Sequence, residues 1–325
     1  MRLSIAMATY NASRFLQPQL ESIAGQQRLP DELVVCDNAS TDDTVAVLNA
    51  FREQAPFPVR IERNSVNLGC TKNFEKAVGL CEGDIIALAD SDDVWYAHKL
   101  ARLMDEFSAS EAIGAAFSDA DIIDEHGQRV GPPLWQRGAF GPRQQSSLRR
   151  DAFRELLRGA RVTGMTMVFR ARYRPRVLPI PTEWHHDAWI SLLISILAEL
   201  RPVDERLVRY RQHAAQDSGV PCSRRGGRPP LSARAERYRS AAQRYEEACE
   251  RVRSWNDPAL RPDALPRLKE KVRHLRWRAV AQTSPLNPPG VLAGLLTGRY
   301  HRCSTGLRAA VADLIHYANP GPRNY

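Results

Sequence analysis

The stretch "ALADSDDVW" (residues 87–95) runs an apolar segment directly into three carboxylates, Asp90, Asp92 and Asp93. Three like charges within four positions repel one another unless a positive group lies between them. Two explanations are open at this point. The stretch is a solvated turn after a strand, since Asp and Ser are common turn residues, or its oxygens bind a divalent cation that bridges to phosphate.

The first 125 residues alternate strand-like and helix-like segments. Strand patterns occupy residues 3–10, 32–37, 58–64, 84–90 and 113–124, and helical patterns occupy residues 13–27, 40–53, 71–83 and 98–110. This alternation predicts an α/β fold with a mostly parallel sheet and helices on both faces. Ligands of such sheets bind at the carboxyl ends of the strands.

Polar residues follow the predicted strands at that edge. They are Thr9-Tyr10-Asn11, Asp37-Asn38, Asn64 and Asp90-Ser91-Asp92-Asp93. Because these ends converge, the acidic cluster is expected to belong to a ligand site. No G-x-G-x-x-G follows the first strand and no Walker A motif is present, which disfavours a dinucleotide site or a P-loop.

The remainder of the chain predicts a second, basic region. Residues 130–165 look like a long loop, and residues 163–170 and 201–213 resemble strands on either side of a helix within 182–200. The Pro-, Gly- and Arg-rich residues 219–232 indicate a linker. Residues 1–219 hold 26 Lys and Arg against 29 Asp and Glu (net −3), whereas residues 220–325 hold 20 against 8 (net +12). We therefore expect a catalytic domain over 1–217 and a basic helical region over 218–325.

Cysteine usage and hydropathy predict a cytoplasmic protein. The six cysteines show no CxxC pair, which favours reduced thiols over a disulfide framework or a zinc site. The N-terminal apolar stretch is too short for a signal peptide. The longest apolar stretch, residues 188–200, is shorter than the roughly 20 residues of a membrane-spanning helix. The chain is expected to be soluble or peripheral on the cytoplasmic face of the membrane.

Five motifs, in this order, resemble a family 2 glycosyltransferase of the GT-A fold. They are "SIAMATYN" (4–11), "LVVCDNASTDDT" (33–44), "NLGCTKNF" (67–74), "DSDDVW" (90–95) and "HHDAW" (185–189). The resemblance is to bacterial enzymes, often rhamnosyltransferases, that extend O-antigen or other cell-envelope polysaccharides. It implies transfer of a sugar, usually with inversion, from a UDP- or dTDP-sugar to a glycan or a lipid-linked glycan.

The resemblance also assigns a metal site. Asp90-Ser91-Asp92 is similar to the family's DXD motif, so Asp92 should bind Mg²⁺ or Mn²⁺ while Asp90 and Ser91 contact the nucleotide sugar. A cation would ease departure of the diphosphate. His213, in "YRQH", is either a further metal ligand or polar surface. Asp93 either serves the site or caps the helix that follows.

Donor contacts are implied for residues at the other strand ends. Thr9, Tyr10 and Asp37 are expected near the base, and Asn11 is expected to bind the nucleotide sugar. The alternatives are an ordinary strand-end aromatic for Tyr10 and a cap of the next helix for Asp37. Asn38 stands where the family usually has a second Asp. Two further residues, Lys72 and Asn73, open a helix, where backbone N–H groups suit phosphate. For Lys72, a solvated surface charge is an equal alternative.

The resemblance places the general base at Asp187. A carboxylate within hydrogen-bond distance can accept the acceptor's hydroxyl proton. The alternative is a helix N-terminal carboxylate favoured by the helix dipole. A metal site made of His185, His186 and Asp187 is disfavoured because adjacent helical residues point in different directions. His186 is expected to orient the acceptor and His185 to be exposed.

Two other functional classes are weighed against this interpretation. A nucleotidyltransferase would need a Gly-rich, basic loop after the first strand, which "TYNASRF" lacks. A non-enzymatic basic binding protein would use the C-terminal region, but no nucleic-acid-binding motif is present and no nucleic acid is expected. That region either contacts a membrane through amphipathic helices, packs on the catalytic domain, or forms a homo-oligomer.

Overall fold

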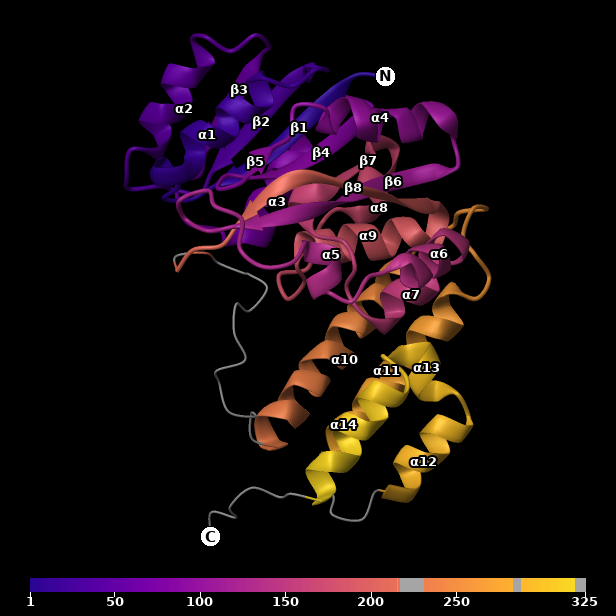
Figure 1. Ribbon diagram of the computed structural model, residues 1–325. Helices are drawn as coiled ribbons and strands as arrows, with labels where there is room; N and C mark the ends of the chain where they lie inside the picture. Colours follow the sequence, from indigo (N-terminus) through magenta and orange to yellow (C-terminus); the bar gives the residue numbers. More distant parts are fainter. Residues whose placement is uncertain (215, 217–230, 283–287, 319–325) are drawn as a thin grey trace. The chain divides into compact units, whose positions relative to one another are not determined.

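The computed structural model describes residues 1–214, 216, 231–282 and 288–318 (Figure 1). The chain divides into two compact units, one of Met1–Ala152 with Arg161–Gly219 and one of Phe153–Ala160 with Val220–Tyr325. The segment Phe153–Ala160, which the sequence interpretation assigns to the catalytic domain, groups with the second unit. The 217/218 boundary and residues 219–230 of the predicted linker lie outside the described residues, and its last two residues, Leu231 and Ser232, are helical. The functional division stays a prediction.

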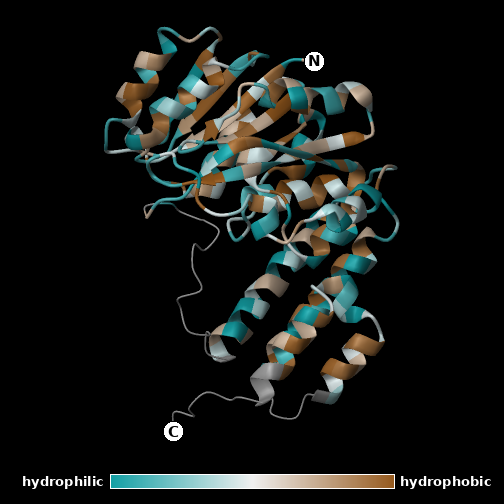
Figure 2. Ribbon diagram, in the orientation of Figure 1, coloured by the Kyte–Doolittle hydropathy of each residue, from teal (hydrophilic) through white to brown (hydrophobic). Residues whose placement is uncertain are grey.

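The first unit is built on an eight-stranded sheet with the order β3-β2-β1-β4-β7-β6-β8-β5. Its strands are β1 (Leu3–Thr9), β2 (Glu32–Asp37), β3 (Val59–Arg63), β4 (Ile85–Asp90), β5 (Val94–Trp95), β6 (Ile113–Ile123), β7 (Met167–Arg170) and β8 (Glu199–Arg211). All residues of β6 and β7 are buried, as expected for a sheet covered on both faces. Figure 2 shows hydrophobic residues concentrated on these central strands.

Six of the eight strands run in the same direction, and β5 and β7 run against them. The reversal of β7 places its N-terminus at the carboxyl edge of the parallel strands. Strands β2 and β3 lie on one side of β1, and β4 lies on its other side. The strand order therefore reverses between β1 and β4. Sheets of this type bind ligands beside such a reversal.

Helices cover both faces of the sheet, with α4 above it and α9 below it in Figure 1. The helices of this unit are α1 (Ser13–Ala24), α2 (Thr44–Arg52), α3 (Cys70–Leu80), α4 (Lys99–Ala109), α5 (Leu134–Arg137), α6 (Pro142–Arg150), α8 (Arg174–Val177) and α9 (His186–Leu197), with 3₁₀ turns η1 (Gly164–Thr166) and η2 (Ala171–Tyr173). The segments predicted as helices in the first 125 residues are helical.

Residues 130–165, predicted as a long loop, contain short helices. Trp135 of α5 packs edge-on against Phe140, with ring centroids 5.0 Å apart, and both rings contact Phe117 of β6. Helix α6 begins with Pro142, a residue whose missing N–H costs nothing at a helix start. Burial against the sheet therefore orders a stretch whose Gly and Pro content predicts irregular structure.

The second unit is helical, as predicted for the C-terminal region. Its helices are α7 (Ala152–Arg158), α10 (Leu231–Arg253), α11 (Ala264–Ala281), α12 (Pro288–Leu296), α13 (Arg299–Cys303) and α14 (Leu307–Ala318). A buried ion pair joins α11 to α14, because Arg278 donates two hydrogen bonds of 2.8 Å to Asp313. Tyr300 of α13 donates a third to the same carboxylate, at 2.7 Å.

Two predictions from composition can be compared with the described residues. In the ranges that the structure describes, we find no helix with the length and apolarity needed to cross a membrane. The five cysteines in those ranges carry free thiols. Cys222 lies outside them.

Candidate active site

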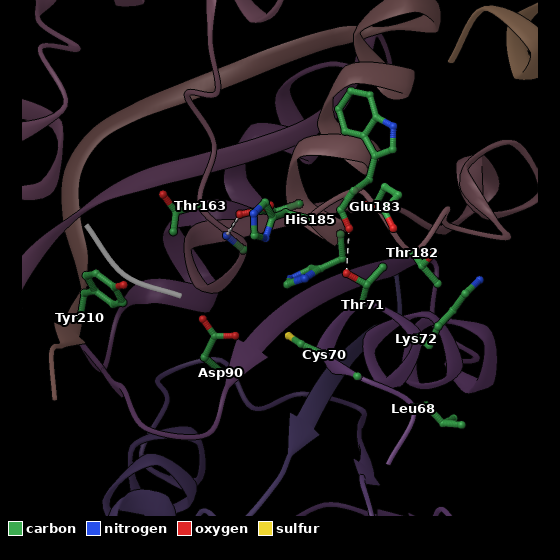
Figure 3. A pocket seen from close by; sticks show the side chains of 15 residues that line it. Leu68, Cys70, Thr71, Lys72, Asp90, Thr163, Thr182, Glu183, His185 and Tyr210 are labelled. Atoms are coloured by element: carbon green, nitrogen blue, oxygen red, sulfur yellow. Dashed lines mark hydrogen bonds between the residues drawn. The ribbon is translucent and has the colours of Figure 1, made fainter. Parts of the chain in front are cut away.

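A cavity of about 400 Å³ opens at the carboxyl edge of the sheet (Figure 3). It is formed by the start of α3, the end of β4, the turn before β7, the segment before α9 and the end of β8. Its lining residues are Leu68, Gly69, Cys70, Thr71, Lys72, Asp90, Thr163, Gly164, Thr182, Glu183, Trp184, His185, His186, Asp187 and Tyr210. The cavity therefore brings Lys72, Asp90 and Asp187, three predicted site residues, into one space.

The acidic turn after β4 is held by the end of β8. Strand β5 pairs antiparallel with β8, which brings residues 90–93 beside Arg211. Arg211 donates from Nε to the backbone oxygen of Asp92 (2.7 Å) and from its backbone N–H to Oδ1 of Asp93 (3.0 Å). Asp93 is fully buried and does not cap α4, whose N-cap is His98.

The two predicted metal ligands lie together. Nε2 of His213 is 2.9 Å from Oδ2 of Asp92, and the imidazole packs on the Phe15 ring with centroids 4.7 Å apart. A carboxylate oxygen beside an imidazole nitrogen fits a divalent metal. In the described part of the chain no group of three or more His, Cys, Asp or Glu side chains is arranged to hold a metal. A cation here would complete its shell with substrate oxygens and water, as Mg²⁺ commonly does.

Negative charge accumulates at this end of the cavity. Burial, together with the charges of Asp92 and Asp187, raises the pKa of Asp90 to about 8, and Lys99 opposes the rise. In Figure 3 the Asp90 carboxylate points into the cavity between Cys70 and Tyr210. A cation would relieve this repulsion, which agrees with the second explanation of the acidic stretch.

Asp187 lies in the first turn of α9, on the cavity wall. Its Oδ2 accepts a hydrogen bond from the Gly164 N–H (2.9 Å) and its Oδ1 one from the Ala188 N–H (2.6 Å). These two bonds fix the orientation of a half-buried carboxylate. The arrangement suits a base that must meet a substrate hydroxyl in a defined position.

The two histidines before Asp187 differ in environment. His185 is exposed and occupies the N-cap position of α9. His186 is buried and stacked on Phe74 with ring centroids 3.8 Å apart, and burial lowers the pKa of its imidazole. Its Nε2 has no hydrogen-bond partner within the described ranges. A neutral imidazole with a free nitrogen on the cavity wall is consistent with acceptor orientation, which stays a prediction.

The residues predicted to contact the base lie outside the cavity lining. Asp37 is fully buried and accepts hydrogen bonds from the hydroxyls of Thr9 (3.1 Å) and Ser40 (2.5 Å) and from the Ser40 N–H (3.0 Å). Because Asp37 is fully buried, a contact between its carboxylate and a base would require the groups that cover it to move. Tyr10 is 52% exposed, and its ring is accessible for packing on a base.

Asn11 and Ser91 also lie outside the cavity lining. Asn11 adopts a left-handed backbone (φ 46°), and its Oδ1 accepts the Thr41 N–H at 2.9 Å. This bond links the loop between β1 and α1 to the loop between β2 and α2. Ser91 is half-buried in the acidic turn. Their contacts with a nucleotide sugar stay predictions.

A network of asparagines supports the "NLGCTKNF" segment. Asn64 donates to Asn38 (3.1 Å) and to Asn73 (2.9 Å), and Asn38 donates to Asn67 (2.6 Å). Asn73 is 2% exposed and donates to the Cys36 carbonyl at 2.7 Å. The structure thus gives Asn73 a role in joining α3 to the end of β2, away from the cavity.

Lys72, by contrast, reaches the cavity wall. Its Nζ pairs with Glu75 at 2.7 Å, and the side chain remains about a third exposed. Both sequence alternatives, a phosphate contact and a solvated charge, are compatible with this position.

Three residues that the sequence interpretation missed organise the site. They are Arg211, Gly164 and Lys99, a fully buried lysine at the first position of α4. A lysine is disfavoured at a helix N-terminus by the helix dipole. The occurrence of Lys99 at such a position, six residues after the acidic cluster, was the sequence signal that could have identified it. Nothing in the local sequence distinguishes Gly164 from an ordinary loop glycine.

Comparisons with known proteins give consistent results. The family model described as Glycosyl transferase family 2 matches residues 4–171. An uncharacterized glycosyltransferase of Nostoc sp. is 27% identical over 220 residues, covering 67% of this chain and 66% of its own length. Abequosyltransferase RfbV of Salmonella typhimurium is 38% identical over 105 residues (32% of each chain). The dTDP-rhamnosyl transferase RfbG of Shigella flexneri is 36% identical over 104 residues (30% of this chain, 36% of its own). The chain thus spans about a third to two thirds of the length of these relatives.

Solved structures support the fold. Residues 1–349 of S. aureus TarS, in complex with UDP-GlcNAc, align with a TM-score of 0.59 at 14% identity, covering 98% of this chain and 82% of that one. Mannosyltransferase PcManGT from Pyrobaculum calidifontis, in complex with GDP-Man and Mn²⁺, aligns with a TM-score of 0.55 at 19% identity, covering 99% and 88%. At these identities the likeness concerns the fold alone, and it confirms the predicted GT-A architecture.

Proposed function

The chain belongs to glycosyl transferase family 2, and we propose that it transfers a sugar from a nucleoside-diphosphate donor to an acceptor hydroxyl with inversion, assisted by Mg²⁺ or Mn²⁺. Family membership confirms the prediction of a glycosyltransferase-class enzyme. One observation carries the proposed mechanism: Asp187 and Asp90 line the same cavity, and the turn that begins at Asp90 also holds the Asp92–His213 pair.

The roles follow from this geometry. A cation held by Asp92 and His213 would neutralise the diphosphate as it leaves. Asp187 accepts the proton of the attacking hydroxyl. The oxygen of that hydroxyl bonds to the anomeric carbon while the bond from that carbon to the phosphate oxygen breaks. A single displacement of this kind inverts the anomeric centre. Gly164 and Ala188 keep the Asp187 carboxylate in its orientation.

The substrates are proposed from the relatives. The donor is a UDP- or dTDP-sugar, and the acceptor is a glycan or a lipid-linked glycan in bacterial surface polysaccharide synthesis, such as that of O-antigen. The printed names of RfbV and RfbG, an abequosyltransferase and a dTDP-rhamnosyl transferase, support this class of donor. A cytoplasmic location follows from the proposal, since it would place the enzyme with its nucleotide-activated donor.

A donor panel tests the proposal. Purified protein is incubated with UDP-, dTDP- and GDP-sugars and Mn²⁺, binding is measured by calorimetry, and the released nucleotide is identified. We expect one class of donor to bind and to release a nucleoside diphosphate. Consumption of added pyrophosphate, with formation of a nucleoside triphosphate and a sugar 1-phosphate from the NDP-sugar, would instead indicate a nucleotidyltransferase. Absence of binding across the panel, with either Mn²⁺ or Mg²⁺, would contradict the proposal.

We also propose that the second unit contacts an anionic membrane. Leu292 and Leu296, one helical turn apart on α12, are 53% and 89% exposed, and Leu307 of α14 is exposed as well. Apolar side chains on helices within a region of net charge +12 suit a lipid surface that is both apolar and negatively charged. A lipid-linked acceptor would give this contact a purpose.

Replacing Leu292 and Leu296 together by Glu is expected to weaken vesicle binding at least tenfold, because about 1.5–3 kcal/mol of burial is lost per leucine. The measurement is co-sedimentation with vesicles that contain 30% phosphatidylglycerol, a composition chosen as about a third anionic lipid. Leu29→Glu, at an exposed leucine of the first unit, is the matched control. Unchanged sedimentation of the double variant would contradict the membrane contact, and a change in oligomeric state alone would indicate that this surface serves a protein contact.

A further inference from the structure

Lys99 is buried next to the acidic turn. Its side chain is 0% exposed, its Nζ donates to the Met165 carbonyl at 2.6 Å, and Nζ lies 3.2 Å from the centroid of the Trp95 ring. Burial lowers the pKa of Lys99, and the negative charges of Asp93 and Asp90 oppose that effect. Either protonation state of the amine can donate the bond to Met165. Removing an amine from water costs free energy, and the hydrogen bond to Met165 and the contact with the Trp95 ring offset part of that cost.

The turn that Lys99 holds also holds the proposed base. Met165 is the central residue of η1 (Gly164–Thr166), and the Gly164 N–H of the same turn donates to Asp187. Thr166 closes the turn, because its N–H (3.0 Å) and its hydroxyl (2.7 Å) both donate to the Thr163 carbonyl. A displacement of Met165 is therefore transmitted to Gly164 one residue away.

The turn is also in close contact with the start of α9. A Cβ atom added at Gly164 would lie 2.6 Å from Nε2 of His186 and 3.6 Å from Cβ of Asp187. His186 cannot easily move aside, since it is stacked on Phe74. The absence of a side chain at residue 164 thus allows the backbone N–H to reach the Asp187 carboxylate.

We propose that Lys99 is a positioning residue that joins Trp95, in the strand directly after the acidic turn, to η1 and thereby holds Asp187 in place relative to the donor site. The inference rests on the proposed function, in which Asp187 accepts the proton. Lys99 touches neither the cavity nor the reacting atoms, so it acts through Met165 and Gly164. Displacement of a reacting group by about 1 Å can reduce a rate 10²-fold.

Kinetics of Lys99→Met test this role. Methionine keeps the length of the chain and removes the amine. We expect kcat for transfer to fall about 10²-fold, while the Kd of the donor in Mn²⁺ changes less than threefold, because the residues that bind the donor are unchanged. Lys271→Met is the matched control: Lys271 is a buried lysine of the second unit whose Nζ donates to the Cys303 carbonyl at 2.7 Å. Its kcat should stay within twofold of the wild type.

If Lys99→Met does not fold, a second variant and a second measurement still test the proposal. Lys99→Met combined with Asp93→Asn removes the buried amine together with one of the two carboxylates, Asp93 and Asp90, whose charges act on it, so that less negative charge is left uncompensated. In either variant, the amide resonance of Gly164 in ¹H–¹⁵N spectra should move as it does in Asp187→Asn, which weakens the same hydrogen bond. This spectroscopic result does not depend on activity.

The outcomes separate the two proposals. If the wild type transfers sugar and kcat of Lys99→Met stays within threefold, with the Gly164 resonance unmoved, Lys99 does not position Asp187. If the wild type acts on no donor, the proposed function fails, and the Gly164 resonance still decides whether Lys99 holds η1. A rise in donor Kd that accounts for the whole loss would place Lys99 in donor binding and overturn the inference.

Discussion

Asp187→Asn is expected to reduce transfer by about 10²–10⁴-fold, the usual contribution of a general base. The amide keeps the size of the side chain and an oxygen that can accept the Gly164 N–H, but it cannot take up the proton of the attacking hydroxyl. Donor affinity should change little, because the carboxylate acts on the acceptor. The measurement is steady-state release of nucleoside diphosphate in the presence of acceptor, together with calorimetry of the donor in Mn²⁺.

The control for Asp187 is Glu199→Gln, at an exposed carboxylate just beyond the opposite end of α9. It should transfer at the wild-type rate. If Asp187 merely stabilises the N-terminus of α9, Asp187→Asn would instead lower the free energy of unfolding by about 0.3–1 kcal/mol and leave kcat unchanged. That result would remove Asp187 from the mechanism.

Asp92→Ala is expected to abolish the dependence of donor binding on the cation and to lower turnover by about 10²–10³-fold. This range corresponds to the several kcal/mol that a metal ion supplies to a leaving group. Chelation of the wild-type protein with EDTA should produce the same loss, and added Mn²⁺ should restore activity only in the wild type. Calorimetric titration of the nucleoside diphosphate with and without Mn²⁺ measures the effect directly.

Asp105→Asn, at an exposed carboxylate on α4, is the control for Asp92. It should retain full dependence on Mn²⁺. His213→Gln separates the two explanations of His213: a ligand would weaken Mn²⁺ binding when replaced, whereas a side chain that only packs on Phe15 would leave it intact. Turnover that is insensitive to EDTA would contradict the cation site as a whole.

Much of the site could be predicted because the fold brings strand ends together. The alternation of strands and helices predicts a mostly parallel sheet, and in such a sheet residues such as Thr9, Asp37 and Asp90 must meet at one edge. The observed register agrees, since Thr9 lies opposite Asp37 and Ala8 lies opposite Asp90. The motif order then identified the family.

The contacts of individual side chains could not be predicted in the same way. Asp37 and Asn73 follow the expected pattern, yet both are buried and hydrogen-bonded within the protein. A motif specifies which residue types occur and at what spacing. Whether a polar group faces a ligand or a neighbouring backbone group depends on packing between distant segments.

The amino-acid sequence by itself determined the α/β class, the family, the carboxylates after the fourth strand and the acidic residue at the start of α9. Only the tertiary structure decided that Asp92 meets His213, that Gly164 supports Asp187, and that Lys99 is buried and bonded to Met165. The physical reason is the strand order. The antiparallel insertion of β7 and the pairing of β5 with β8 bring segments up to 121 residues apart into hydrogen-bond contact, and neither pairing leaves a periodic signal in the local sequence.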